Sequence, residues 1–417
     1  MLEFSDAPYQ FFPPRPSAPV IWAGRQVNRF LALPGKNHRI SELKFEGELD
    51  SLRERQEKGD RLVFVINHPS HSDPQVVTEL HRQLGIPSCY LAAYDVFLRS
   101  SGHAWAMQRL GNFSIDRDGS DRKAMTTAIG VIKEGHFALN IFPEGNVYLT
   151  NDRVTPFLDG TAFIAVKAQQ ALEDEDVHVV PVSLKFTHLT APRAGVTARL
   201  QQLAEDSGHS FDSSEPLPAV MGLGAHLISD YLFSHGYGDR IGVTEDSFFD
   251  DLVRFANELI SDCESGLGLE SSAERPRIDR IRAIRSTIHQ ARTAESPDVD
   301  PASLVPLAEK AILALRVHGY ITPYLNDHPT IDRYDETVER IAEDFYSRAM
   351  PRTGPRRAIA RIHSPLSVRE YLEQSDGKLR GAVSNLTIDT EATVQRGIDE
   401  INATNDAPGA MLVRDAP

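Results

Sequence analysis

Cysteines and long apolar runs are scarce in this 417-residue chain, and each scarcity excludes a class of protein. The two cysteines, Cys89 and Cys263, lie far apart and match no metal-binding spacing, so we expect two reduced, buried thiols and no disulfide framework. Nowhere do about 18 consecutive apolar residues occur, the length that a membrane-spanning helix needs. The N-terminal residues lack the basic and apolar segments of a signal peptide. We therefore expect a cytoplasmic protein.

Basic residues are outnumbered by acidic ones. The formal net charge of -15 argues against nucleic acid as a partner. Residues 201–350 hold 27 acidic and 13 basic side chains, whereas the rest of the chain holds 32 acidic and 31 basic ones. One segment therefore carries almost all of the excess negative charge, which indicates a separately built module.

Between about residues 40 and 190, apolar strand-like runs alternate with segments of helical periodicity. Gly85 and Gly135 stand at the ends of two predicted helices, where glycine commonly follows the last turn. This alternation predicts an α/β fold with a largely parallel central sheet flanked by helices. Strands are predicted at 61–68, 87–97, 137–145 and 177–186, and helices at 72–85, 121–135 and 160–172.

After about residue 192 the pattern becomes helical, which predicts an all-helical block inserted before the last strand of the sheet. A basic loop, a strand and a short amphipathic piece follow it, over 351–372. The predicted parts are an N-terminal arm (1–39), an α/β domain (40–195 plus 356–405), a helical insertion (196–355) and a frayed tail (406–417).

One strand end carries residues suited to acid–base chemistry. His68 follows a buried run, and Asp73 can fold back towards its imidazole if a helix begins there. A carboxylate on one ring nitrogen lets the other act as a general base. The alternative is that Asp73 only caps the helix, with Pro74 at the first helical position. His71 is a competing base, but more apt to face solvent or to pack.

Two further strand ends carry a carboxylate and a cation. Glu144 and Gly145 follow Pro143 directly after a buried run, at the sheet edge where open α/β folds place ligands. Arg117 follows a short strand-like run, and arginine grips phosphate through its bidentate fork. A simple Pro-Glu-Gly turn and a solvated, ion-paired turn are the alternatives. Pro181 indicates only a buried strand with proline near an edge.

Taken in order, four segments resemble the sequence blocks of the glycerolipid acyltransferase family, which includes the glycerol-3-phosphate and 1-acylglycerol-3-phosphate acyltransferases. They are "NHPSHSD", "GNFSIDR", "FPEGN" and "VVPVS", and the resemblance covers roughly residues 40–190. "IARIHSPLSVREYL" resembles the strand that closes the family's domain.

The resemblance implies a role for each matched residue. His68 would take the proton from an acceptor hydroxyl, and Asp73 would hold His68 in position. The alkoxide would then attack the thioester of acyl-CoA or acyl-carrier protein, with no covalent acyl-enzyme, no metal and no bound cofactor. Arg117 matches a residue associated with the phosphate of the acceptor, and the third block, with Glu144, shapes the acceptor site. That block consists of Phe142, Pro143, Glu144 and Gly145, while Pro181 matches the fourth block.

The third block also departs from the family. Its usual continuation is Thr and then Arg, whereas here Asn146 is followed by Val147 and Tyr148. A cation credited with phosphate binding is therefore missing, which puts glycerol-phosphate specificity in question. We hypothesise that Arg117 and Arg153 share the phosphate. Arg122 and Lys123 are other candidates, and Asp116 weakens the positive field beside Arg117.

Two segments are candidates for peripheral contacts. Residues 7–35 combine aromatic and other apolar side chains with three arginines. This composition suits reversible docking on the inner face of a membrane. An arm packed on the domain is the alternative. The arginine-rich segment 277–292 would contact anionic headgroups or an acidic carrier protein, or simply pair with acidic neighbours. The apolar side chains that we expect to make the membrane contact in residues 7–35 are Phe11, Phe12, Trp22, Phe30 and Leu31.

The leading functional hypothesis is acyl transfer to 1-acylglycerol-3-phosphate, which yields phosphatidic acid in phospholipid biosynthesis. A soluble glycerol-3-phosphate acyltransferase that uses acyl-carrier protein is the first alternative. A non-catalytic acyl- or lipid-binding protein on the same fold is the second, and the intact His68, Asp73 and Glu144 argue against it.

Overall fold

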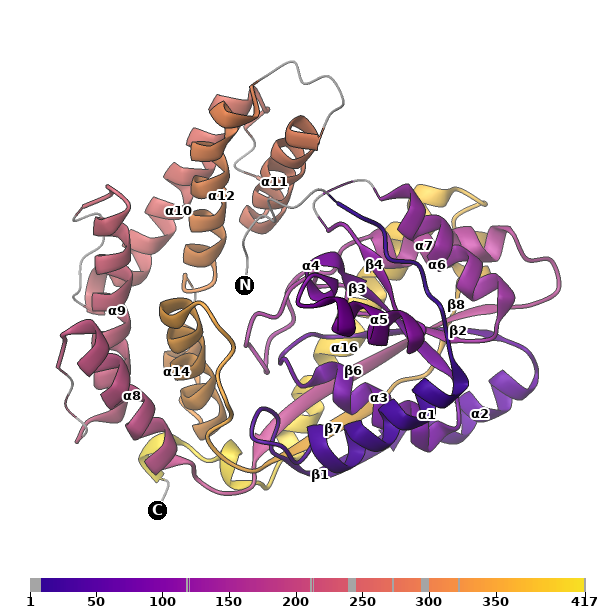
Figure 1. Cartoon of the computed structure of the whole chain (residues 1–417), viewed down its shortest axis with the longest axis horizontal. Coiled ribbons are helices and arrows are strands. Elements are labelled where there is room, and N and C mark those ends of the chain that lie inside the picture. Colours follow the sequence, from indigo (N-terminus) through magenta and orange to yellow (C-terminus); the bar gives the residue numbers. More distant parts are fainter. Residues whose placement is uncertain are drawn as a thin grey trace.

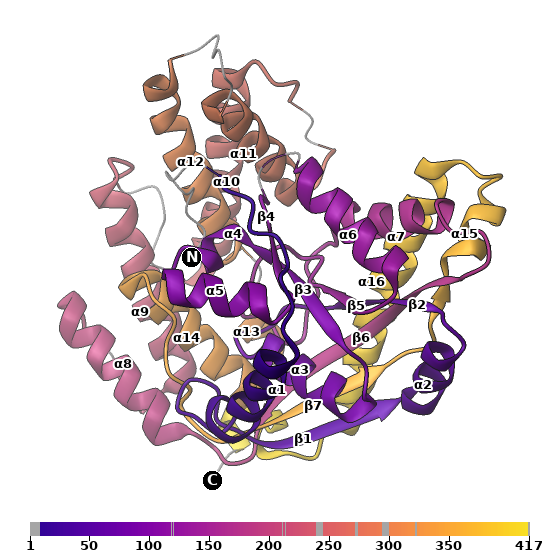
Figure 2. The same ribbon diagram turned by 45° about the vertical axis from the view of Figure 1, so that its right-hand side comes forward.

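The structure is a computed structural model, and it describes residues 9–117, 119, 121–210, 212, 214–238, 245–271, 274–293, 300–321 and 323–415. Within these ranges, one sheet lies between helices, and a group of further helices stands beside it (Figures 1 and 2).

The sheet of the described residues has eight strands in the order β1-β7-β6-β2-β5-β3-β4, with β8 beside β6. Most neighbours are parallel; only β7 and β8 run antiparallel to β6. The strands are β1 (Ile40–Gly47), β2 (Arg61–Ile66), β3 (Ser88–Ala93), β4 (Phe113–Ile115), β5 (Ala138–Ile141), β6 (Val177–His188), β7 (Arg356–Ile362) and β8 (Leu366–Ser367).

Both faces of the sheet are covered, because the strands are apolar on both sides. In β2, Val63 and Val65 face one core with α6, α7 and α16, while Phe64 and Ile66 face another with α2 and α3. The predicted α/β fold is therefore confirmed. The helices of this part are α1 (Ala18–Val27), α2 (Leu49–Glu57), α3 (Asp73–Leu84), α4 (Tyr94–Phe97), α5 (Ser101–Arg109), α6 (Arg122–Glu134), α7 (Gly160–Gln170), α15 (Val368–Gln374) and α16 (Leu379–Thr404), with the π-helical turn η1 (Asn28–Ala32) after α1.

The remaining helices lie in the chain between β6 and β7, and we call them the helical block. They build two apolar cores of their own, one shared by α9 to α12 and one by α8, α9 and α14. Figures 1 and 2 show α14 between the sheet and the pair α8–α9. The block consists of α8 (Arg193–Ser207), α9 (Pro216–Ser234), α10 (Glu245–Leu267), α11 (Arg277–Thr293), α12 (Val305–His318), α13 (Tyr324–Asp327) and α14 (Ile331–Tyr346).

The C-terminal segment differs from the sequence-based expectation. The long helix α16 packs against α7 and β6, although the sequence analysis assigns no helix there. The expectation of a frayed tail at 406–417 is wrong for its described residues: the N–H of Ile331 donates to Met411 O, and the N–H of Val413 donates to Pro329 O, both at 2.9 Å. The tail is anchored because it pairs with the start of α14. The division into domains stays a prediction.

A buried ionic cluster joins the sheet to the helical block. Lys185 of β6 pairs with Asp152, whose other carboxylate oxygen accepts a 2.7 Å hydrogen bond from Arg333 Nε of α14. Burial acts to raise the pKa of Asp152, but Lys185 and Arg333 hold it well below its usual range. The pair is thus fully ionised in the interior, where losing one partner is costly.

We predict that Lys185→Met lowers the free energy of unfolding by about 3–5 kcal/mol, because Asp152 stays buried with less compensation. Urea denaturation of the full chain measures the loss. Lys310→Met is the matched control, since Lys310 pairs with Asp262 near the surface and should cost no more than about 1 kcal/mol. Equal losses in the two variants would contradict the account.

Candidate active site

Four neighbouring parallel strands deliver the candidate residues to one edge of the sheet. His68 follows β2, Asp95 follows β3, Arg117 follows β4 and Glu144 follows β5. These strands are adjacent in the order β2-β5-β3-β4. The carboxyl edge of a parallel sheet is where open α/β folds place ligands, so residues distant in the sequence meet here.

His68 and Asp73 form a hydrogen-bonded pair. The His68 Nδ1 and Asp73 Oδ2 atoms lie 2.6 Å apart, and the same oxygen accepts the Ser70 N–H at 3.0 Å. Burial raises the pKa of Asp73, while the hydrogen bonds from His68 and Ser70 act in the opposite direction. Ser72, not Asp73, occupies the N-cap position of α3. The capping alternative is therefore wrong, because the carboxylate of Asp73 turns back to the imidazole.

The imidazole of His68 is held on several sides but keeps one nitrogen free. Its ring stacks on Phe142 with 4.2 Å between centroids, and its backbone N–H donates to Glu144 Oε1 at 2.7 Å. With Nδ1–H donating to Asp73, the lone pair belongs to Nε2. No side chain or backbone group in the described part of the chain bonds Nε2, and the side chain is 17% exposed. This nitrogen is therefore available to take a proton.

Glu144 closes the loop that follows β5. Its Oε2 accepts the N–H of Thr155 at 3.0 Å, so the two ends of the segment 145–155 meet at one carboxylate. Burial raises the pKa of Glu144 to about 7, although the N–H groups of His68 and Thr155 favour its ionised form. Glu144 thus connects the first and third sequence blocks through the backbone of His68.

Arg117 lies at the neck of the same loop, the place where residues 143–146 and 155–158 come together. Its guanidinium donates to Asn146 Oδ1 at 2.6 Å and to Gly145 O at 3.0 Å, and it lies 3.3 Å from Asp95 Oδ1. Asn146, which replaces the family's threonine, therefore orients Arg117. Pro143 accepts the Leu158 N–H at 3.0 Å and so fixes the other side of the neck.

Arg153 is placed apart from this group. Its guanidinium lies 3.6 Å from Asp327 and over the ring of Tyr324 at 5.8 Å, both in α13. Within the described residues, no hydrogen bond or ion pair joins Arg153 to the other candidate residues. Sharing of a phosphate by Arg117 and Arg153 stays a prediction, and it requires Arg153 to leave Asp327.

The comparison with known families agrees with this arrangement. Residues 49–185 match the family model described as Acyltransferase. The chain contains an acyltransferase domain. The matched segment runs from α2 into β6 and includes all four sequence blocks. No curated protein matches the chain.

The fourth block of the acyltransferase domain lies within β6 rather than at a strand end. Pro181 pairs with Val65 of β2 on one side. On the other side it falls between the residues of β6 that pair with β8 and those that pair with β7. A proline is tolerated in this interior strand because it sits in the gap between two neighbouring strands.

Several residues at the domain's edge are missed by the sequence analysis. Arg282 of α11 donates to the backbone oxygens of Glu144 at 3.2 Å and Pro156 at 3.1 Å, and so clamps the neck of the loop. His289, also in α11, lies 2.6 Å from Asp116, the residue before Arg117. Only the arginine-rich pattern of 277–292 hints at this role. Asp95 gave no such signal, because the sequence analysis places it inside the predicted strand 87–97, whereas β3 ends at Ala93.

The helical block also contacts the loop between His68 and Asp73. His71 Nε2 lies 3.0 Å from Glu343 Oε2 of α14, so the competing base is engaged in a hydrogen bond. Arg352 pairs with Glu339 of α14 and donates to Ser70 Oγ at 3.2 Å. These contacts fix the backbone that carries the His68–Asp73 pair.

The described residues include no group of three or more His, Cys, Asp or Glu side chains arranged to hold a metal ion. The chemistry of the site therefore has to be argued from the side chains present, and the expectation of no bound cofactor stays a prediction.

The raised pKa of Glu144 predicts a pH-dependent stability. The usual pKa of a glutamate carboxyl is 4.5, and that of Glu144 in the folded protein is about 7. Between these two pH values, Glu144 of the folded protein keeps a proton that the unfolded chain has lost. Stability should therefore fall as the pH rises through this window, by up to roughly 1 kcal/mol per pH unit, and level off above it. Urea denaturation at several pH values measures this as the difference between the wild type and Glu144→Gln.

The exposed Glu57 of α2 provides the control. The difference between the wild type and Glu57→Gln should stay flat across the same window. If the difference for Glu144→Gln were also flat, the buried carboxyl of Glu144 would titrate normally and the account of its environment would be wrong.

Proposed function

We propose that the protein is an O-acyltransferase that moves a fatty acyl group from an acyl thioester to the free hydroxyl of 1-acylglycerol-3-phosphate. The observation that carries the proposal is the His68–Asp73 pair, whose 2.6 Å contact uses Nδ1 and leaves Nε2 free beside the third sequence block. Acyl transfer in general follows from the acyltransferase domain.

The proposed reaction needs one base and no covalent enzyme intermediate. His68 Nε2 takes the proton of the acceptor hydroxyl as its oxygen bonds to the thioester carbon. Asp73 stabilises the imidazolium that forms. The tetrahedral intermediate then expels the thiolate, which recovers the proton from His68. The donor is acyl-CoA or acyl-carrier protein, and the products are a diacylated phosphate ester and a free thiol.

The acceptor would lie against the loop that follows β5. Arg117 is held by Asn146 and Gly145 at the neck of this loop, where a phosphate can meet its guanidinium. Arg153 is the second cation proposed for the phosphate. Pro143 and Glu144 shape the wall of the site through their contacts with Leu158, Thr155 and His68.

Long-chain substrates also require contact with lipid, and we propose that α1 and η1 supply it. Trp22, Phe30 and Leu31 are each more than 60% exposed there, beside Arg25 and Arg29. Such a surface suits reversible docking on an anionic membrane. None of the helices in the described ranges has the length and apolarity to cross a bilayer. Phe12 belongs to the packed alternative instead, since it stacks on Phe97 at 5.0 Å.

We predict that His68→Ala lowers kcat by about 10²–10⁴-fold, because the acceptor hydroxyl loses its base. The assay follows labelled acyl-CoA and acyl-carrier protein with 1-acylglycerol-3-phosphate and with glycerol-3-phosphate. His136→Ala, at an exposed histidine outside the site, is the control and should stay within a few-fold of wild type. Equal activity of His68→Ala and wild type would contradict the proposal, and acyl binding without turnover would favour a lipid-binding protein.

The phosphate hypothesis predicts a change in KM rather than kcat. Arg117→Ala and Arg153→Ala should each raise KM for 1-acylglycerol-3-phosphate by about tenfold or more, since each removes a charged hydrogen bond. Neither should change KM for the uncharged 1-acylglycerol. An unchanged KM for the phosphorylated acceptor in Arg153→Ala would exclude that residue from phosphate binding.

A further inference from the structure

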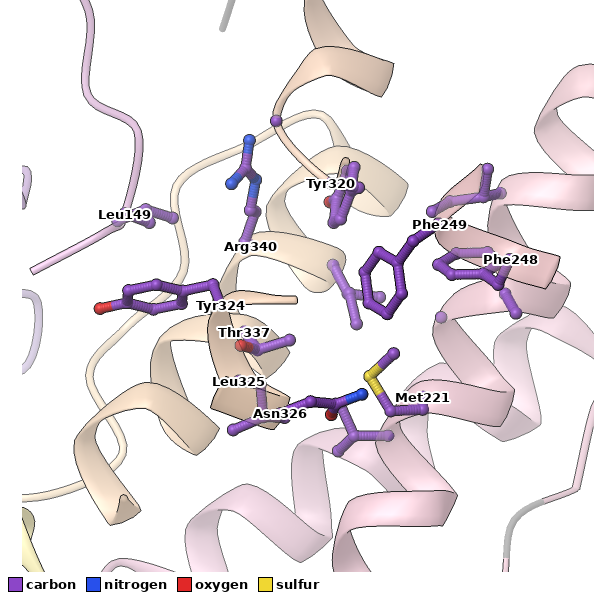
Figure 3. Close-up of a pocket in the computed structure, with 16 residues that line it drawn as sticks. Leu149, Met221, Phe248, Phe249, Tyr320, Tyr324, Leu325, Asn326, Thr337 and Arg340 are labelled. Atoms are coloured by element: carbon purple, nitrogen blue, oxygen red, sulfur yellow. The ribbon is translucent and has the colours of Figure 1, made fainter. Parts of the chain in front are cut away.

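An apolar pocket lies in the helical block, next to the loop of the candidate active site. Figure 3 shows side chains from several helices around it, with Met221, Phe248 and Phe249 on one side and Leu149 on the other. The walls come from α9, α10, α13, α14 and the end of α12. The pocket is partly open to solvent, and its walls are mainly apolar.

Leu149 connects this pocket to the active-site loop. It is the one lining residue from outside the helical block, and it belongs to the segment 145–155, whose ends meet at Glu144. Leu149 is buried and has a φ of 53°, a left-handed conformation that is unfavourable for a bulky side chain. Such strain persists only where the surroundings fix it, as at ligand sites. The loop therefore reaches from the His68 backbone to the pocket wall.

The polar lining of the pocket includes a cation. Arg340 of α14 lies over the ring of Tyr320 at 4.6 Å, and Figure 3 shows its guanidinium between Leu149 and Tyr320. Among the described residues, Arg340 makes no hydrogen bond or ion pair, although this block of the chain is acidic. Burial lowers the pKa of His318 to about 4, and the charges of Arg277, Arg340 and Arg282 act in the same direction, so the three cations lie in one neighbourhood.

We propose that this pocket binds the acyl chain of a single-chain phospholipid, with Arg340 pairing with its phosphate. This inference rests on the proposed function and gives the acyl chain of its acceptor a binding place in the helical block. Arg340 supplies, from the helical block, a cation that the third sequence block lacks.

The apolar walls of the pocket lie next to the guanidinium of Arg340. This arrangement favours a single-chain phospholipid over the acyl-CoA donor. In 1-acylglycerol-3-phosphate, a short glycerol joins the chain to the phosphate. In acyl-CoA, the long pantetheine arm separates them. A neutral monoacylglycerol would leave the half-buried guanidinium of Arg340 without a partner, which is unfavourable.

Isothermal titration calorimetry of the full chain tests whether Arg340 binds the phosphate of the lipid. The probes are 1-oleoylglycerol-3-phosphate, 1-oleoylglycerol and oleoyl-CoA, each below its aggregation concentration. Arg340→Gln should weaken binding of the phosphate-bearing lipid by roughly tenfold and leave 1-oleoylglycerol within about twofold. Arg254→Gln is the control, because Arg254 is exposed on α10, pairs with Asp251 and does not line the pocket. An equal effect on both lipids, or none on either, would overturn the proposal.

Two substitutions at Met221 test the pocket itself. Met221→Trp fills the space and should weaken binding of the oleoyl lipid roughly tenfold while sparing its decanoyl analogue. Met221→Ala enlarges the space and should retain oleoyl binding. Phe233→Trp is the control for bulk, since Phe233 is exposed on α9 outside the pocket. Unchanged oleoyl binding in Met221→Trp would exclude this pocket, and a loss confined to oleoyl-CoA would assign it to the donor.

The binding measurements do not depend on catalytic turnover, so the proposed function and the proposed lipid pocket can be disproved separately. If the lipid binds as described but no acyl transfer occurs, the proposed function is wrong and the site remains. If acyl transfer occurs while Arg340→Gln and Met221→Trp bind normally, the pocket assignment alone is wrong.

Discussion

The hydrogen bond between the buried carboxylate of Asp73 and Nδ1 of His68 is the interaction on which the whole arrangement depends. It fixes which imidazole nitrogen keeps its lone pair and which way the ring faces. The ring is also stacked on Phe142, and its backbone is tied to Glu144. The first and third sequence blocks therefore act as one unit, although 76 positions separate His68 from Glu144.

The helical block is structurally coupled to this unit. Arg282 clamps both stems of the loop that follows β5, while Arg352 and Glu343 hold the loop between β2 and α3. A buried pair of Lys185 and Asp152, bridged to Arg333, joins the block to β6. The block thus contacts both loops of the candidate site, and Leu149 of the second loop lines the pocket in the block.

The α/β fold and the site were predictable where local patterns determine them. Apolar runs ending in His68, Arg117 and Glu144 predict strand ends, and parallel strands bring these ends to one edge. The contacts of Arg282 and Arg340 were not predictable, because they depend on how distant helices pack. Asn146 is a second example. In the sequence it is a departure from the family's pattern, whereas in the structure its side chain accepts a hydrogen bond from Arg117.

The C-terminal segment illustrates the same limit. The helix α16 carries polar residues on much of its surface and buries only a narrow stripe, so its periodicity is weak until β6 and α7 are in place. The tail after it has no pattern of its own, and it is held by pairing with Thr330 and its neighbours and by a hydrogen bond from Arg193 to Val413 O.

The kcat of Asp73→Asn, compared with wild type in acyl transfer to 1-acylglycerol-3-phosphate, tests the central claim most directly. This substitution keeps the size of the side chain but removes the charge that orients and stabilises the His68 imidazole. The account predicts a loss of about 10²–10⁴-fold in kcat with little change in KM. A kcat close to that of wild type would contradict it.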